Sequence, residues 1–327
     1  MFIKRLNSIP GKYVAIHSRC KSVFSLLRNE SAKNDVDANI RYPYQVVQPG
    51  RLSPIKAVPE FIAKPDYRKT TLLFTNRASC IAINSEEMIR KMKETCLLAK
   101  HVLQTASSVL EPGVATDYID EIVHAEIIKC GAYPSTLHYK GYPKSCCTSV
   151  NNVACHGIPD DTILQDGDII NIDITVFYLG CHGDTSNTFQ IGDVDETGLA
   201  LISSTRECLN RAIDICKPGA KFSDIPEVIE PFALEKGLSV CKKFVGHGIG
   251  QHFHTPPNVW HVKTHRVDKR RMEPGMIFTI EPILMEGDTR VKILSDGWTT
   301  VSRDNLRSAQ AEHTVLITQS GHDILTL

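Results

Sequence analysis

The sequence has no apolar run that approaches the roughly 18 uncharged residues needed to cross a bilayer. It has no excess of either charge, because basic and acidic residues number 37 each, so the bulk chain gives no sign of nucleic-acid binding. None of its 11 cysteines forms a Cys-x-x-Cys pair, so a zinc ribbon or a thioredoxin-like motif is not supported. We expect reduced thiols in a cytosolic or organellar matrix compartment.

The beginning of the chain lacks acidic side chains, and the first carboxylate is that of Glu30. Serines and apolar residues are interleaved there with cations: Lys4, Arg5, Lys12, Arg19, Lys21 and Arg28. A basic, acid-free amphipathic leader is typical of an organellar transit peptide. We therefore expect residues 1–45 to direct import into the mitochondrial matrix, with a plastid or the cytoplasm less favoured. A basic tail without an addressing role is the alternative.

Residues 46–80 contain several prolines and little periodicity. Proline removes backbone donors and favours extended chain, which predicts a linker or an arm lying across the catalytic domain. Residues 81–327 remain, about the length of one large domain.

Apolar residues at helical spacing predict two helices at the start of this domain. Asn84 and Glu87 form a capping-box pattern before the first helix, which runs until Pro112-Gly113, and the second follows Thr116 and stops at Gly131.

This arrangement recurs later in the chain. Pro112-Gly113 aligns with Pro218-Gly219, and Gly131 then aligns with Gly237 without a gap. We expect two related halves with a site between them, the alternative being chance similarity between amphipathic helices.

Strand-like runs follow each helical block: 147–155, 169–178, 188–192, 243–245, 276–284, 298–301 and 313–318. These runs commonly meet turns rather than helices, which predicts an α+β fold with an antiparallel or mixed sheet and helices on one face. No Gly-x-Gly-x-x-Gly or Walker loop follows an early strand, which argues against a Rossmann domain.

Four carboxylates and one histidine lie in or at the ends of these runs: Asp173, Asp184, His247, Glu281 and Glu312. Burying a carboxylate in an apolar strand is costly unless a cation compensates it. We therefore expect metal ions to supply the shared charge. Taken singly, Asp184 as a turn cap and His247 as a structural residue are the ordinary alternatives.

The strand pattern predicts how the first two acids meet. Asp173 alternates with Ile172 and Ile174 and so faces away from them, and the following hairpin returns Asp184 towards it. Glycines flank His247, where the backbone can pass close to a ligand. An oxygen-dominated set suits Mn(II), Fe(II) or Co(II), with Zn(II) still open, and two such ions would favour hydrolysis.

The five residues lie in short motifs whose order and spacing closely resemble those of type 1 methionine aminopeptidases. The resemblance extends from about residue 81 to the C-terminus. Its motifs are 155–159, 171–173, 182–185, 246–250, 253–254, 278–282 and 308–314. The resemblance implies a pseudo-symmetric "pita-bread" fold and two divalent metal ions per subunit (Co, Mn, Fe or Zn). The leader and the lack of an N-terminal zinc module are similar to the organellar form.

The resemblance also implies roles for single residues. The five residues above would be metal ligands, with Asp184 and Glu312 bridging, and Glu281 would also accept a proton from the attacking water. His156 would position the substrate, and His254 would hydrogen-bond its carbonyl or the developing oxyanion. Their ordinary alternatives are a turn histidine and a structural histidine.

The thioether of a methionine side chain requires a pocket of matching shape with polarisable contacts rather than charged groups. The residues that match the family's substrate pocket, besides His156 and His254, are Tyr139, Tyr142, Cys147, Phe253 and Trp298. Without the resemblance, the last two would be interpreted as core aromatics. Thr136 stands where relatives often carry cysteine, which leaves the pocket's shape in question.

The expected function is removal of N-terminal methionine from nascent or newly made polypeptides, favoured by a small second residue. An Xaa-Pro aminopeptidase or prolidase is the alternative enzyme, and a metal-free scaffold is the alternative class. The short connection from His254 to Glu281 argues against type 2 enzymes. We expect a monomer without membrane or nucleic-acid partners. The basic run 263–271 is expected to be a solvated loop, with ribosome contact left open.

Overall fold

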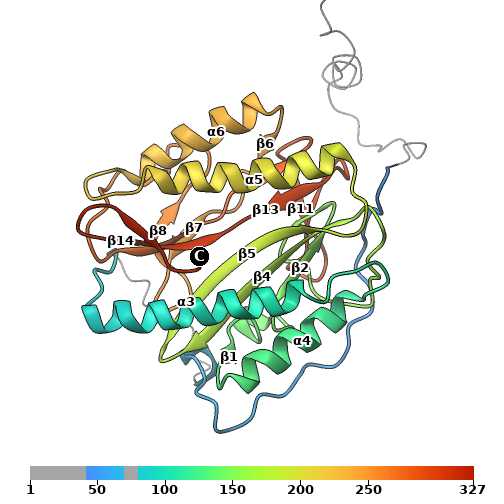
Figure 1. The fold of residues 1–327 in the computed structure, drawn as a ribbon, viewed down its shortest axis with the longest axis horizontal. Coiled ribbons are helices and arrows are strands. Elements are labelled where there is room, and N and C mark those ends of the chain that lie inside the picture. The colour runs from blue at the N-terminus through green and yellow to red at the C-terminus, as the bar shows by residue number, and fades with distance from the viewer. Residues whose placement is uncertain (1–41, 70–79) are drawn as a thin grey trace, which may run out of the picture. The chain divides into compact units, whose positions relative to one another are not determined.

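The computed structural model describes residues 42–69 and 80–327 (Figure 1). Residues 1–41 of the expected leader (1–45) and residues 70–79 of the expected arm (46–80) lie outside the described residues. Within the described residues, no helix combines the length and apolar character that crossing a membrane requires.

The first helix pair is α3 (Glu86–Ser107) and α4 (Thr116–Lys129). The cap of α3 is Ser85, whose hydroxyl accepts a hydrogen bond from the Met88 N–H at 3.3 Å. The expected Asn84 cap is therefore wrong by one residue, because the Asn84 side chain donates instead to the Gly275 carbonyl at 2.9 Å. The first helix also ends at Ser107, well before Pro112-Gly113.

The second helix pair is α5 (Glu196–Asp214) and α6 (Ile225–Glu235), which follows the short 3-10 helix η2 (Phe222–Asp224). Gly113 and its aligned partner Gly219 have φ of +96° and +87°, and Gly131 and Gly237 have +72° and +74°. Left-handed backbone is readily adopted only by glycine. The two halves thus turn in the same way at the same aligned positions.

In the described residues, the strands pair antiparallel in four sheets. The first holds β1 (Tyr133–Pro134), β4 (Ile169–Tyr178) and β2 (Cys147–Val150), with β5 (Cys181–Gln190) paired to β4. The largest runs in the order β15 (His322–Ile324), β14 (His313–Ile317), β9 (Ile277–Ile280), β7 (Gly246–Gly248) and β8 (Thr255–Val259).

Two smaller sheets complete the set. One is β13 (Ser308–Gln310), β10 (Ile283–Met285) and β6 (Ser239–Val240). The other is β11 (Val291–Ile293), β12 (Thr300–Ser302) and β3 (Val153–Cys155). The remaining elements are the helical turns α2 (Asp66–Lys69) and η1 (Tyr139–Gly141).

Several strand boundaries differ from the sequence prediction. The strand expected at 243–245 lies at Gly246–Gly248, and that at 276–284 is interrupted at Glu281 and Pro282. Pro282 has no N–H to donate to a ladder, so the chain leaves one sheet there and enters another. The run 188–192 is the end of β5, and 147–155 is divided at Asn151, whose φ is +48°.

The helix pairs lie on the outside of the strands, with α5 and α6 along one edge of the view and α3 and α4 along the other (Figure 1). One apolar cluster joins α3 and α4 to β4 through Ile170, Ile172, Ile174 and Val176, all fully buried. A second joins α5 and α6 to β9 and β14 through Phe278, Ile280 and Val315. Alternation then turns the other faces of these strands away from the helices. The predicted α+β class is confirmed.

Candidate active site

The two halves of the chain meet where β5 approaches the start of β14. The Glu312 N–H donates to the Ser186 carbonyl at 2.9 Å, and the Ser186 N–H donates to the Glu312 carbonyl at 3.4 Å. The Thr314 hydroxyl also donates to the Asp184 carbonyl at 2.7 Å. These bonds hold two acids from distant parts of the sequence on neighbouring strands.

The β4–β5 hairpin presents both of its aspartates on the same face. Asp173 is paired with Ser186, and Thr175 with Asp184, so the four side chains alternate away from the apolar face. The Thr175 hydroxyl donates to Asp184 Oδ1 at 2.7 Å. Oδ1 of Asp173 is buried and has no hydrogen-bond partner among the described residues.

His247 lies on β7 with its Nε2 3.7 Å from both Asp184 Oδ2 and Glu281 Oε1. Burial lowers the pKa of this imidazole to about 4, so a ring nitrogen keeps the lone pair that a metal needs. The neighbouring glycines have a structural reason. A Cβ at Gly246 would lie 2.3 Å from the Thr279 carbonyl oxygen, and one at Gly248 would lie 2.1 Å from that of Pro256. The glycines therefore allow a close approach to adjacent strands.

Glu281 follows β9 and is held by three neighbours. The Thr279 hydroxyl donates to its Oε1 at 2.9 Å, Gln310 Nε2 donates to its Oε2 at 3.2 Å, and its own N–H donates to His261 Nε2 at 3.2 Å. Glu312 is also buried, between β13 and β14.

Burial is the main cause that raises the pKa of all four acids, Asp173, Asp184, Glu281 and Glu312. Their mutual repulsion raises it further for Asp184, Glu281 and Glu312. In the described part of the chain, none of the four forms an ion pair with lysine or arginine. The acids thus lack a compensating cation from the protein.

This set fits divalent metal ions. Ligand atoms of Asp184, His247 and Glu312 all lie within 4.8 Å of one another. The unpaired Oδ1 of Asp173 and the nearby carboxylate of Glu281 extend the set. Carboxylates with one neutral imidazole suit hard or borderline ions.

Every site residue named from the sequence lines a single cavity of about 280 Å³. Around the acid cluster its wall includes both candidate substrate histidines and the five pocket residues: His156, His254, Tyr139, Tyr142, Cys147, Phe253 and Trp298. The volume is near the lower bound of about 300 Å³ for ligand pockets.

The aromatic part of the wall is well packed. The Tyr142 hydroxyl donates to the carbonyls of Gly157 at 2.8 Å and Cys146 at 3.1 Å, and its ring meets Trp298 edge-on at 5.1 Å. Thr136 also lines the cavity, and its hydroxyl donates to the Lys144 carbonyl at 2.9 Å. The threonine therefore presents no unpaired hydroxyl to the cavity.

The two candidate histidines reach the cavity from irregular segments. His156 has a φ of +57°, and its ring packs edge-on against Phe244 at 4.9 Å and Trp298 at 5.9 Å. Left-handed backbone is unfavourable for a non-glycine residue, which marks this position as constrained by its surroundings. His254 stacks on Tyr139 at 5.2 Å and lies 4.1 Å from the His247 ring.

Sequence reasoning missed further residues of the site. Thr175 lines the cavity, while Thr279 and Gln310 bond Glu281. Each lies two positions from a predicted ligand in a strand-like run, so strand alternation could have found them. His261 and the cavity-lining Lys140 carried no comparable signal.

The chain matches Metallopeptidase family M24 over residues 90–319. The mouse (Mus musculus) protein "Methionine aminopeptidase 1D, mitochondrial" is 52% identical over 284 residues, which are 86% of this chain and 84% of the mouse protein. The human (Homo sapiens) protein of the same name is 47% identical over 323 residues, 98% of this chain and 93% of its own.

The chain belongs to family M24. A crystal structure of methionine aminopeptidase from Rickettsia prowazekii matches with a TM-score of 0.74 and 38% identity over 76% of this chain and all of that one. The predicted pita-bread fold and the predicted family, the type 1 methionine aminopeptidases, are confirmed. This methionine aminopeptidase is a metallopeptidase that removes N-terminal methionine from polypeptides.

The basic run 263–271 of the aminopeptidase bonds mainly to its own surroundings. Lys263 pairs with Glu227 at 2.5 Å, Arg270 pairs with Asp268 at 2.5 Å, and Arg271 donates to the Gly219 carbonyl at 2.6 Å. These local partners favour the solvated loop over a docking surface.

Proposed function

We propose that this methionine aminopeptidase would hold two divalent metal ions with Asp173, Asp184, His247, Glu281 and Glu312, and that Asp184 and Glu312 would be ligands of both. The observation that carries this proposal is a cluster of four acids, Asp184 and Glu312 buried and Asp173 and Glu281 partly buried, without a lysine or arginine partner in the described structure. When bound, the ions supply Lewis-acid polarisation of the scissile carbonyl and a water that is nucleophilic at neutral pH.

The chain's own groups then position the reactants and move the proton. Hydrogen bonds from Thr279 and Gln310 orient the Glu281 carboxylate, which accepts a proton from the attacking water. His254, stacked on Tyr139, donates a hydrogen bond to the carbonyl oxygen as negative charge develops there. His156, held by Phe244 and Trp298, positions the substrate near the scissile amide.

The aromatic wall would receive the methionine side chain. Tyr139, Tyr142, Phe253 and Trp298 offer polarisable faces, and Cys147 lies beside Asp173 in the β2–β4 register. The cavity has a volume of about 280 Å³, and we propose that the enzyme prefers a small second residue.

Peptide hydrolysis before and after removal of metal tests the proposed methionine aminopeptidase site against the alternative of an Xaa-Pro aminopeptidase. We expect chelator-treated enzyme to be inactive and to recover with Mn(II) or Co(II), cleaving Met-Ala-Ser far faster than Leu-Ala-Ser or Ala-Pro-Ser. Glu281→Gln should lower kcat by about 10² to 10⁴-fold through loss of the proton acceptor. Asp323→Asn, at an exposed acid paired with Lys93, is the control. Equal rates of cleavage of Met-Ala-Ser and Leu-Ala-Ser would refute the methionine pocket. Cleavage of Ala-Pro-Ser as fast as Met-Ala-Ser would favour an Xaa-Pro aminopeptidase.

We further propose that the enzyme acts in the mitochondrial matrix on nascent or newly made polypeptides. The support is the basic leader, together with relatives named mitochondrial. A fluorescent protein fused to residues 1–45 should enter mitochondria, and a fusion with Lys4, Arg5 and Lys12 changed to glutamine should not. A cytosolic signal from both fusions would remove the organellar assignment.

A further inference from the structure

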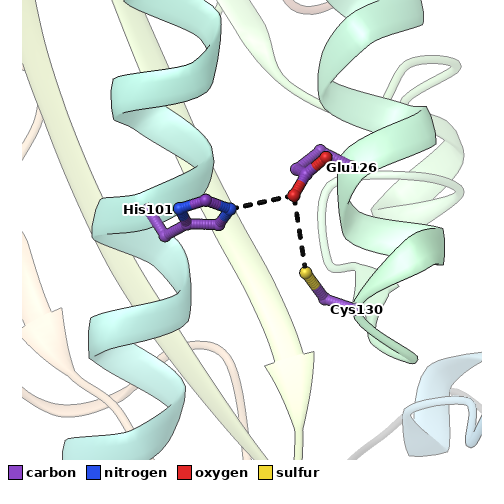
Figure 2. Close-up of side chains that lie close together, drawn as sticks. All are labelled: His101, Glu126 and Cys130. Atoms are coloured by element: carbon purple, nitrogen blue, oxygen red, sulfur yellow. Dashed lines mark hydrogen bonds and ion pairs between the residues drawn. The ribbon is translucent and has the colours of Figure 1, made fainter.

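A second group of metal-ligand side chains lies on the first helix pair. His101 projects from α3 towards Glu126 and Cys130 at the end of α4 (Figure 2). His101 Nε2 lies 2.8 Å from Glu126 Oε1, and Cys130 Sγ lies 3.8 Å from the same oxygen. Ligand atoms of the three residues all lie within 4.8 Å of one another. None of the three lines the catalytic cavity.

We propose that His101, Glu126 and Cys130 form a binding site for a Zn(II)-like ion, separate from the catalytic centre. Thiolate, imidazole and carboxylate are the three side-chain ligands that zinc takes in proteins. Tetrahedral coordination at zinc's usual bond lengths separates such ligand atoms by about 3.3 to 3.5 Å. Two of the separations, 2.8 and 3.8 Å, lie on either side of that range and within about half an ångström of it. The third, between the ring nitrogen of His101 and Cys130 Sγ, is within 4.8 Å and would have to shorten on binding if it exceeds that range.

The local fold supports this assignment in two ways. Glu126 and Cys130 are four residues apart, so they share one face of α4 and its terminus. Cys130 is also the C-cap of α4, where the helix dipole favours a cation. His101 is half-exposed, which leaves a route for the ion and a position for water as a further ligand.

Metal binding would replace the lysine ammonium beside Glu126 with a metal ion. Lys129 Nζ donates to both Glu126 oxygens, at 3.0 and 3.2 Å, but its side chain is 75% exposed and free to swing into solvent. The metal would displace this ammonium from Glu126, and the Cys130 thiol would lose its proton to solvent as the S–metal bond forms. The Lys129 ammonium is thus a competitor for the site.

The site would join α3 to α4 through a metal instead of the His101–Glu126 hydrogen bond alone. It lies on the outer helix pair, so occupation should change metal content and leave turnover unchanged. The rival explanation is an ordinary surface network of His101, Glu126 and Lys129 in which Cys130 takes no part.

Co(II) titration of the full chain tests the proposal, because cobalt bound to thiolate gives a near-ultraviolet charge-transfer band. After chelator treatment, the wild-type protein should develop this band. C130S should lose it, and H101A should require more Co(II). K129M should require less Co(II) than the wild type, because the competing ammonium is gone. C80S, at an exposed cysteine outside the cluster, is the matched control and should keep the band.

Peptide hydrolysis and retained zinc are measured in addition to the cobalt band. Hydrolysis of Met-Ala-Ser by C130S at the wild-type rate shows that the variant is folded and its catalytic centre intact. Zinc retained after dialysis should be lower in C130S than in C80S. An undiminished band in C130S, or no band in the wild-type protein, would overturn the site. A K129M protein that binds Co(II) no more tightly would also contradict it, since the competition is part of the claim.

Discussion

Asp184 shows most clearly how a single residue of the site serves function at the expense of stability. It is buried, repulsion from Asp173 and Glu281 adds to the burial that raises its pKa, and one of its hydrogen-bond donors is the neutral hydroxyl of Thr175. Without a metal, such a group is costly, since a buried charge without a partner loses its hydration. Its position fits the proposed role as a metal ligand.

Asp184→Asn should therefore separate the two properties. We expect turnover of Met-Ala-Ser to fall to background, because a proposed metal ligand is lost. The metal-free variant should be more stable than the metal-free wild type by about 1 to 2 kcal/mol, because one of four clustered acids is neutral. The new amide oxygen can still accept from Thr175. Urea unfolding in chelator, alongside peptide hydrolysis, checks both effects. Full activity, or a loss of stability, would contradict this account of the cluster.

His124 gives a prediction for acid pH. Its Nε2–H donates to the Ala57 carbonyl at 3.1 Å, and its Nδ1 lies 2.8 Å from the Ser145 hydroxyl. Burial lowers the pKa of this imidazole, although nearby Asp120 opposes the effect and Lys56 adds to it. The unfolded chain, with a pKa of about 6.5, then binds a proton that the folded chain takes up only at lower pH.

The stabilising contribution of neutral His124 is therefore present above about pH 6.5 and is lost as pH falls through its folded pKa. His124→Gln should reduce the dependence of unfolding free energy on pH below 6.5, by up to about 1.4 kcal/mol per pH unit. His265→Gln, at an exposed histidine, is the control. Urea unfolding at a series of pH values measures the slopes, and parallel curves for all three proteins would contradict the assignment.

At this scale the sequence predicted much of the site. The strand alternation around Asp173 and the glycines beside His247 correctly marked segments that reach the cavity. The structure adds a second reason for the glycines at 246 and 248, because a Cβ there would meet the backbone of neighbouring strands, which the sequence could not reveal. His261 could not be foreseen, since its contact with the Glu281 N–H depends on tertiary packing alone.

At the scale of elements, the segment from Tyr42 to Lys69 has specific bonds to the helices and sheets. The Val47 N–H donates to Asn152 Oδ1 at 2.7 Å, and Asn152 Nδ2 donates back to the Val47 carbonyl at 3.2 Å. Lys56 pairs with Asp120 at 2.8 Å, and Ile62 is buried in a small apolar cluster with Tyr133. We propose that this arm stabilises the domain that it crosses.

Asn152→Ala tests the arm. It removes both bonds to Val47 from a fully buried side chain, so we expect a loss of about 2 kcal/mol of unfolding free energy. Cleavage of the arm by a dilute protease should also become faster. Gln48→Ala, at an exposed arm residue, should change neither. If Asn152→Ala unfolds at the wild-type urea concentration with an unchanged cleavage rate, the arm is not held as described.

Element types were predictable from periodicity, but several boundaries were not. The strand Ile169–Tyr178 was predicted at its observed limits, because its alternation is regular and long. The strand expected at 243–245 was displaced to Gly246–Gly248, because glycines carry no apolar pattern while sheet geometry requires them there. Local propensity does not record such tertiary demands.

For the whole molecule, the aligned halves are the feature that places the site. The paired glycines at 113 and 219, and at 131 and 237, adopt the same left-handed turns, so each half positions its helices in the same way. Asp184 from the first half and Glu312 from the second then meet through the Ser186–Glu312 bonds. The repeat predicted that a site lies between the halves, whereas these particular bonds required the structure.

The most direct test of this convergence is anomalous diffraction from crystals of the Mn(II)-loaded enzyme. We predict two peaks about 3.5 to 4 Å apart in the acid cluster, with Asp184 and Glu312 contacting both. A single peak there in crystals of fully active enzyme, or peaks only elsewhere, would contradict the dinuclear centre on which the proposed mechanism rests.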